Sequence, residues 1–129
     1  MIQVTALHSS DHLFDFPSIS EAAIKRPVNG RHDNGGLGMW MTIDLGHWSA
    51  GNFGKHVYEV KFEVEPDEIA VIELEELSDL GRYERIDFDQ HRLALLDRGT
   101  RFTKIHEGAG YVQGILHDLT AISSFRKIN

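Results

Sequence analysis

The sequence contains no cysteine, no long run of apolar residues and comparatively few basic residues. Without cysteine the chain cannot form disulfide bonds, iron–sulfur clusters or zinc sites built on thiolates, and such chains are typical of the reducing cytoplasm. Without about 18 consecutive apolar residues there is no candidate for a helical membrane span. The opening residues, 1–8, also lack the basic and apolar regions of a signal peptide. We therefore expect a cytoplasmic protein with no membrane partner.

The charge balance is acidic, since 13 lysines and arginines face 20 aspartates and glutamates, for a formal net charge of −7. The densest basic group is Arg82, Arg85 and Arg92. Because contact with a phosphate backbone requires clustered lysine and arginine, we expect no nucleic-acid partner. The 129 residues, 41% of them hydrophobic, have the length and composition of one globular domain spanning 1–129.

Hydrophobic periodicity predicts strands and short helices in alternation. Period-two patterns predict strands over 2–8, 57–65 and 69–74, and a last strand pair over 111–117 and 122–125. Capping and glycine signals predict helices over about 18–25, 75–81 and 87–98, the last followed by Gly99. In the first strand, Ile2, Val4, Ala6 and His8 share one face.

A glycine-rich stretch, 35–44, leads directly into another short strand. Alternation puts Leu37, Met39, Met41 and Ile43 on one face, and Gly38, Trp40, Thr42 and Asp44 on the other. The first face is apolar and should enter the core. On the second, an aromatic ring stands between a bare glycine and a small hydroxyl, an arrangement that suits a flat ligand stacked on the indole, although a plain core or edge aromatic has the same pattern.

The first strand ends in Leu7-His8-Ser9-Ser10, which resembles the His-Gly-Ser/Thr motif of the ADP-ribosyltransferase superfamily. The similar branch is the histidine-tyrosine-glutamate one, which includes the poly(ADP-ribose) polymerases and small phage and bacterial members. The resemblance implies that His8 and Ser10 hold the adenosine ribose of NAD. It also implies that the backbone of Ser9, which replaces the usual glycine, contacts the nicotinamide amide.

Two later segments resemble the same family. Gly38-Met39-Trp40-Met41-Thr42 is similar to its Gly-x-Tyr-Phe-Ala segment, which implies that Gly38, Trp40 and Thr42 line the NAD site, with Trp40 in place of the tyrosine that stacks on nicotinamide. The segment 113–122 is similar to the closing motif, which puts Gln113 where the family has its catalytic glutamate. Glutamine keeps a hydrogen bond but has no charge, and losing such electrostatic stabilisation costs about a hundred- to a thousand-fold in rate.

The resemblance implies an α+β domain of split, mostly antiparallel sheets with short flanking helices. It implies NAD as cofactor, with Gln113 and His8 as catalytic residues, and either ADP-ribosyl transfer to a protein acceptor or hydrolysis of NAD. Glu107 would supply the missing carboxylate if the last strand were shifted. The alternative is a catalytically inactive module of the same fold that binds a protein partner, because fold does not imply function.

A third hypothesis is a metal site that uses His8, Asp11 and His12, with His106 or His117. The spacing is weak evidence because three of its members fall in one loop. We rank this hypothesis last and expect no metal.

Overall fold

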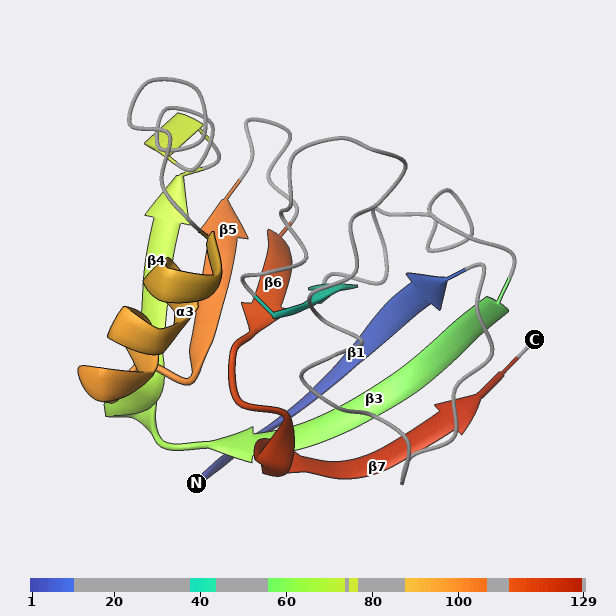
Figure 1. Ribbon diagram of the computed structural model, residues 1–129. Coiled ribbons are helices and arrows are strands. Elements are labelled where there is room, and N and C mark those ends of the chain that lie inside the picture. The colour runs from blue at the N-terminus through green and yellow to red at the C-terminus, as the bar shows by residue number, and fades with distance from the viewer. Residues whose placement is uncertain (11–37, 44–55, 74, 77–87, 107–111, 129) are drawn as a thin grey trace.

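The computed structural model describes residues 1–10, 38–43, 56–73, 75–76, 88–106 and 112–128, which form one α+β domain (Figure 1). Within these residues a seven-stranded mixed sheet is accompanied by one helix of ten residues. None of the described helices is long and apolar enough to cross a membrane. In chain order the elements are β1 (Ile2–Ser10), β2 (Met39–Thr42), β3 (His56–Val64), η4 (Pro66–Glu68), β4 (Ile69–Glu73), α3 (Phe88–Asp97), β5 (Phe102–His106), β6 (Val112–Leu116), η6 (Leu119–Ala121) and β7 (Ile122–Lys127).

The strand order across the sheet is β4-β5-β6-β2-β1-β3-β7. Among the seven described strands only β4 and β5 are parallel neighbours, and α3 lies between them in the chain, as is usual for a crossover between parallel strands. Every residue of β1 pairs with β3, and every residue of β2 pairs with β6. By contrast, β1 and β2 share the single pair Leu7 and Thr42. The expected split into separate sheets is therefore replaced by one sheet, whose two halves run in different directions and meet at that pair (Figure 1).

The two faces of the sheet follow the predicted alternation. The larger core cluster contains Met39 and Met41, which were expected in the core, and side chains that lie two residues apart along β1 and β3: Val4, Ala6, Tyr58, Val60, Phe62 and Val64, with Phe102, Leu116, Ala121 and Ile122 from later elements. On the opposite face Ile105 and Ile115 form a second cluster, against which Trp40 and Ile72 pack. β5 and β6 each contribute buried apolar side chains to both faces, since Phe102 and Leu116 belong to the larger cluster and Ile105 and Ile115 to the second.

One prediction about strand pairing was wrong, and one strand was not predicted. The strands at 111–117 and 122–125 exist as β6 and β7, but they do not pair with each other, because β6 pairs with β5 and β2 whereas β7 pairs with β3. The turn η6, capped by the Asp118 side chain at the Thr120 amide, leads from one half of the sheet to the other. Strand β5 was not predicted. The helix at 18–25 and most of that at 75–81 lie outside the described residues.

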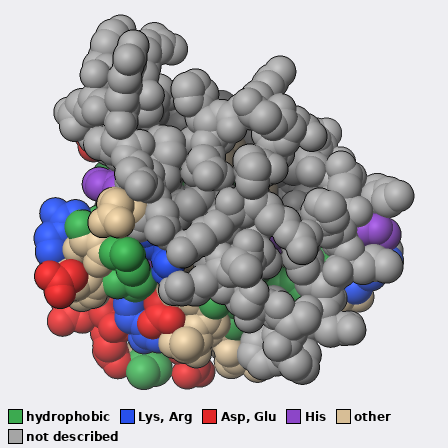
Figure 2. Space-filling model, viewed as in Figure 1, with side chains coloured by type: hydrophobic (Ala, Val, Ile, Leu, Met, Phe, Trp, Pro, Cys, Tyr) green, Lys and Arg blue, Asp and Glu red, His purple; other side chains and the backbone are tan. Residues whose placement is uncertain are grey.

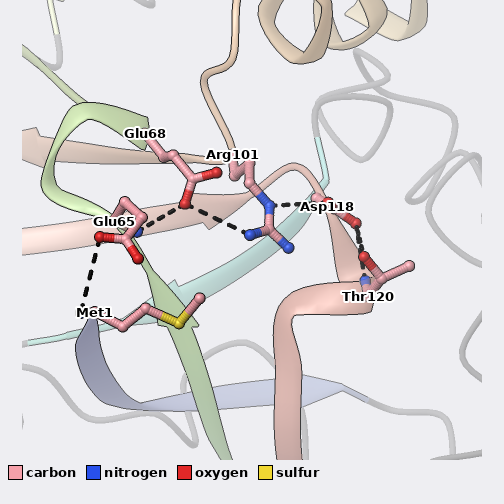
Figure 3. A network of polar contacts seen from close by, with 6 residues as sticks. All are labelled: Met1, Glu65, Glu68, Arg101, Asp118 and Thr120. Carbon is pink, nitrogen blue, oxygen red and sulfur yellow. Dashed lines mark hydrogen bonds and ion pairs between the residues drawn. The ribbon is translucent and has the colours of Figure 1, made fainter.

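Arg101, just before β5, ties together three turns at one end of the sheet (Figure 3). Its Nε donates to Asp118 Oδ2 at 2.9 Å, and its Nη1 lies 3.5 Å from Glu68 Oε1. The same Glu68 oxygen accepts the backbone N–H of Glu65 at 2.7 Å, which closes the cap of η4. Since Arg101 is half-buried, these bonds are partly shielded from solvent and fix the chain where η4, β5 and η6 converge.

Candidate functional site

The three strands that carry the resemblance are neighbours, with β2 in the middle. Trp40 lies on β2, His8 on β1 to one side and Gln113 on β6 to the other. Gln113 is directly opposite Thr42, and Trp40 is directly opposite Ile115. The fold thus brings together three segments separated by tens of residues in the sequence. These segments meet at the middle of the sheet.

The side chains divide between the two faces of the sheet. Trp40 packs on Ile115, and Gln113 lies two residues from Ile115 in the same strand, so Trp40, Thr42 and Gln113 share one face. His8 pairs with Tyr58 of the larger core cluster, and their ring centroids are 6.4 Å apart. The His8 ring is therefore on the face opposite Trp40. A ligand stacked on the indole would meet Gln113 and Thr42 rather than the imidazole.

His8 nevertheless acts on Trp40 through the backbone. Its Nδ1–H donates to the Trp40 carbonyl oxygen at 2.6 Å, which fixes the proton on Nδ1 in the neutral ring. Burial lowers the pKa of His8, and the hydrogen bond to Trp40 only partly opposes this shift. The neutral imidazole is thus the form that the fold selects, and it adds a bond where β1 and β2 share a single residue pair.

The backbone conformation of Gly38 and its contact with β6 require glycine at this position. Its φ is +140°, a conformation that L side chains rarely adopt, and a Cβ there would lie 2.2 Å from the carbonyl oxygen of Leu116. The side-chain position of Gly38, which was expected to leave room for a ligand, is occupied by the backbone at the end of β6. Thr42 is buried and Gln113 half-buried. The backbones of Ser9 and Ser10 pair with Val57 and His56, and their side chains are not among the described ones.

The remaining candidates do not converge. Glu107, Asp11 and His12 lie outside the described residues. His106 is exposed at the end of β5, 3.8 Å from Glu73, whereas His117 is buried after β6. No group of three potential metal ligands occurs among the residues that the structure describes.

A cavity of about 370 Å³ lies between α3 and the face that carries Trp40. The cavity is lined by His91 and Leu95 of α3, by Arg98 just after the helix, and by Ile72 and Ile115 of the sheet.

The polar residues that line or support this cavity were not predicted as a site. Thr103 Oγ1 and His117 Nε2 are 2.7 Å apart, both residues are buried, and Arg92 Nη1 donates to the His117 carbonyl oxygen at 3.2 Å. A sequence signal existed for Arg92, because it lies three and four residues before Leu95 and Leu96 and thus on the inward side of the helix. For His117 the alternation of β6 gives the face, since Gln113 and Ile115 precede it at spacings of two.

Comparison with protein-family models, with curated proteins and with solved structures finds no significant match for this chain.

Proposed function

We propose that this protein binds NAD on the Trp40 face of the sheet, in a fold resembling that of the ADP-ribosyltransferases, and cleaves it by ADP-ribosyl transfer or hydrolysis. The observation that carries the proposal is the adjacency of β1, β2 and β6, with Gln113 opposite Thr42 and two register positions from the pair of Trp40 and Ile115. The half-buried indole has Ile105 and Ile115 behind it and suits a stacked nicotinamide ring.

The proposed chemistry is dissociative. The bond between nicotinamide and the ribose breaks, the electron pair leaves with nicotinamide, and water or a protein side chain adds to the oxocarbenium-like carbon and loses a proton. Gln113 would accept or donate a hydrogen bond at the 2′-hydroxyl of that ribose and so orient it. Since glutamine carries no charge, the proposal predicts slow turnover.

The role proposed for His8 differs from the one that the resemblance implies. Because its ring is on the opposite face, His8 would act as a positioning residue that holds the Trp40 carbonyl through Nδ1. Ser10 remains the proposed contact to the adenosine ribose of NAD, and the backbone of Ser9 the proposed contact to the nicotinamide amide.

The second candidate is a catalytically inactive module of the same fold, and the neutral Gln113 favours it. An acidic surface for a basic partner has less support. Glu59 bonds Arg126 at 3.0 Å, and Glu68 bonds Arg101, so part of the acidic charge is paired within the chain. Figure 2 shows acidic and basic side chains interspersed on the described part of the visible face.

Nicotinamide release from NAD and calorimetric NAD binding, each with and without cell lysate, separate the two candidates. The variants are Trp40→Ala, Trp40→Phe, which keeps a flat ring, and Gln113→Glu. Release that is lost in Trp40→Ala, kept in Trp40→Phe and raised in Gln113→Glu supports the enzyme, and dependence on lysate indicates transfer to a protein. Binding without release supports the inactive module. A folded protein that neither binds nor cleaves NAD contradicts the NAD site.

A further inference from the structure

The described sheet ends in two edge strands, β4 and β7, which differ in their protection (Figure 1). An edge strand has a row of backbone N–H and C=O groups without ladder partners, and proteins usually protect such rows with basic side chains or irregular pairing. Strand β7 has both features, since it carries Arg126 and Lys127 and its register with β3 shifts between Lys61 and Phe62. Strand β4, Ile-Ala-Val-Ile-Glu, has no basic residue, no proline and an unbroken register with β5. Of the two described edges, β4 is therefore the one suited to accept another strand.

The middle of β4 is open to solvent, because Val71 is 56% exposed. Ile69 packs against the larger core cluster and Ile72 against the second one, so alternation puts Val71 on the same face as Ile69. Side chains on neighbouring strands lie about 5 Å apart when they are directly opposite each other. A strand added at this edge would therefore gain apolar contacts beside Val71 and Ile69 as well as backbone hydrogen bonds.

The charge of this edge is concentrated and of one sign. Residues 62–81, which contain β4, have eight aspartates and glutamates and no lysine, arginine or histidine. Asp67, before the strand, and Glu73, at its end, are both exposed. On the neighbouring β5, Lys104 supplies one positive charge and His106 lies 3.8 Å from Glu73. The carboxylates at the two ends of β4 favour a basic partner, because opposite charges on neighbouring strands attract and like charges repel.

The same charges oppose pairing of β4 with a second copy of the chain. In either strand direction, such pairing would bring the carboxylates of one copy close to those of the other. The occupant that fits the edge is thus a different segment, apolar in its middle and basic at its ends.

We propose that the outer edge of β4 binds an extended peptide segment that has an apolar centre and a lysine or arginine at each end. The segment adds an eighth strand to the described sheet. Its apolar side chains lie beside Val71 and Ile69, and its basic ends meet Glu73 and Asp67. This inference goes beyond the proposed function and does not depend on NAD.

The probe is the synthetic peptide acetyl-KTVTVTK-amide, whose sequence is the same in both directions, so the test does not depend on the direction of the added strand. It is titrated into the ¹⁵N-labelled protein at low ionic strength. We expect saturable amide shifts across β4 and β5, and none on β7, with a dissociation constant on the order of 0.1–1 mM. Amide hydrogen exchange in β4 should slow when the peptide is bound.

Two matched peptides separate strand pairing from charge. Acetyl-KTVPVTK-amide keeps both charges but has a proline in the middle of the ladder, and it should bind at least about tenfold more weakly. Acetyl-ETVTVTE-amide keeps the strand pattern and reverses the charge, and it should also bind about tenfold more weakly. Raising the salt concentration to about 0.3 M should weaken acetyl-KTVTVTK-amide several-fold.

Two protein variants at exposed positions locate the site. Glu73→Gln should weaken acetyl-KTVTVTK-amide about two- to fivefold. Glu63→Gln makes the same charge change on β3, which lies between β1 and β7, and should have little effect. Equal binding of the proline peptide, absent shifts, shifts centred on β7, or equal losses in the two variants would overturn the proposal. A dimer of the peptide-free protein that protects the amides of β4 would overturn it as well, because a second copy would then occupy the edge.

Discussion

Replacing Gly38 by alanine tests whether this glycine serves the sheet or a ligand. Two costs add in the folded state. A side chain at φ +140° is strained, by about 1–3 kcal/mol, and a Cβ 2.2 Å from the Leu116 carbonyl oxygen forces backbone to move, by about 1–3 kcal/mol more. Alanine also restricts the unfolded chain, which returns about 0.4–1 kcal/mol. We expect the free energy of unfolding to fall by roughly 2–5 kcal/mol.

Gly99 provides the matched control for this substitution. It follows α3 with φ +87°, its N–H donates to the Leu96 carbonyl, and the next N–H, of Thr100, donates to Leu95, which is the Schellman arrangement. A Cβ there would meet nothing within 4 Å, so Gly99→Ala isolates the conformational cost, about 1–2 kcal/mol before the unfolded-state gain.

Urea unfolding at equilibrium measures both variants. Equal losses in the free energy of unfolding for Gly38→Ala and Gly99→Ala would refute the steric argument. A Gly38→Ala protein that stayed stable but lost NAD binding would instead indicate that this glycine contacts the ligand.

Three further outcomes are expected from the titrating and charged groups. Because the folded protein lowers the pKa of His8, the unfolded state binds the proton more tightly, and the free energy of unfolding should fall as the pH drops below about 6.5. The variant His8→Asn, whose amide N–H can replace Nδ1–H, should reduce that dependence. A pH series of urea midpoints measures it. Burial alone would raise the pKa of Asp118, but hydrogen bonds from Thr120 and Arg101 lower it overall. The stabilisation by the Asp118 carboxylate is therefore present at neutral pH and is lost in acid below about pH 4. The variant Asp118→Asn should reduce the fall in melting temperature in that acid range, which thermal unfolding at a series of pH values measures. Arg101→Lys should destabilise the protein by about 1–2 kcal/mol because one ammonium cannot reproduce the bonds to both Asp118 and Glu68, and an unchanged urea midpoint would contradict the role of that network.

The local features of the fold were predictable because they follow from spacing within a strand or helix. Alternation placed Val4 and Ala6 on one face of the first strand and assigned Met39 and Met41 to the core, and the glycine after 87–98 marked the end of α3. These patterns depend on side-chain periods of 2 and 3.6, which the sequence displays directly.

The strand order was not predictable in the same way. It depends on contacts between distant segments, such as β2 between β1 and β6, and on the crossover that makes β4 parallel to β5. Strand β5 was not predicted because its buried apolar residues, Phe102 and Ile105, lie on opposite faces, so its sequence shows no regular alternation of apolar and polar residues. The cavity was not predictable because it depends on distant segments: Thr103 of β5 bonds His117, which follows β6, and Arg92 of α3 bonds the His117 carbonyl.

The face assignment explains how the middle of the sheet holds its shape. Each half is joined by continuous ladders, but among the described residues the halves share only the pair Leu7 and Thr42. The His8 bond to the Trp40 carbonyl crosses the same junction, so a side chain supplies the link that the backbone ladder lacks. Because that acceptor belongs to the residue whose indole forms the proposed nicotinamide platform, a change at His8 would move the platform without touching the ligand. A histidine on the far face can therefore matter to a site that it does not enter.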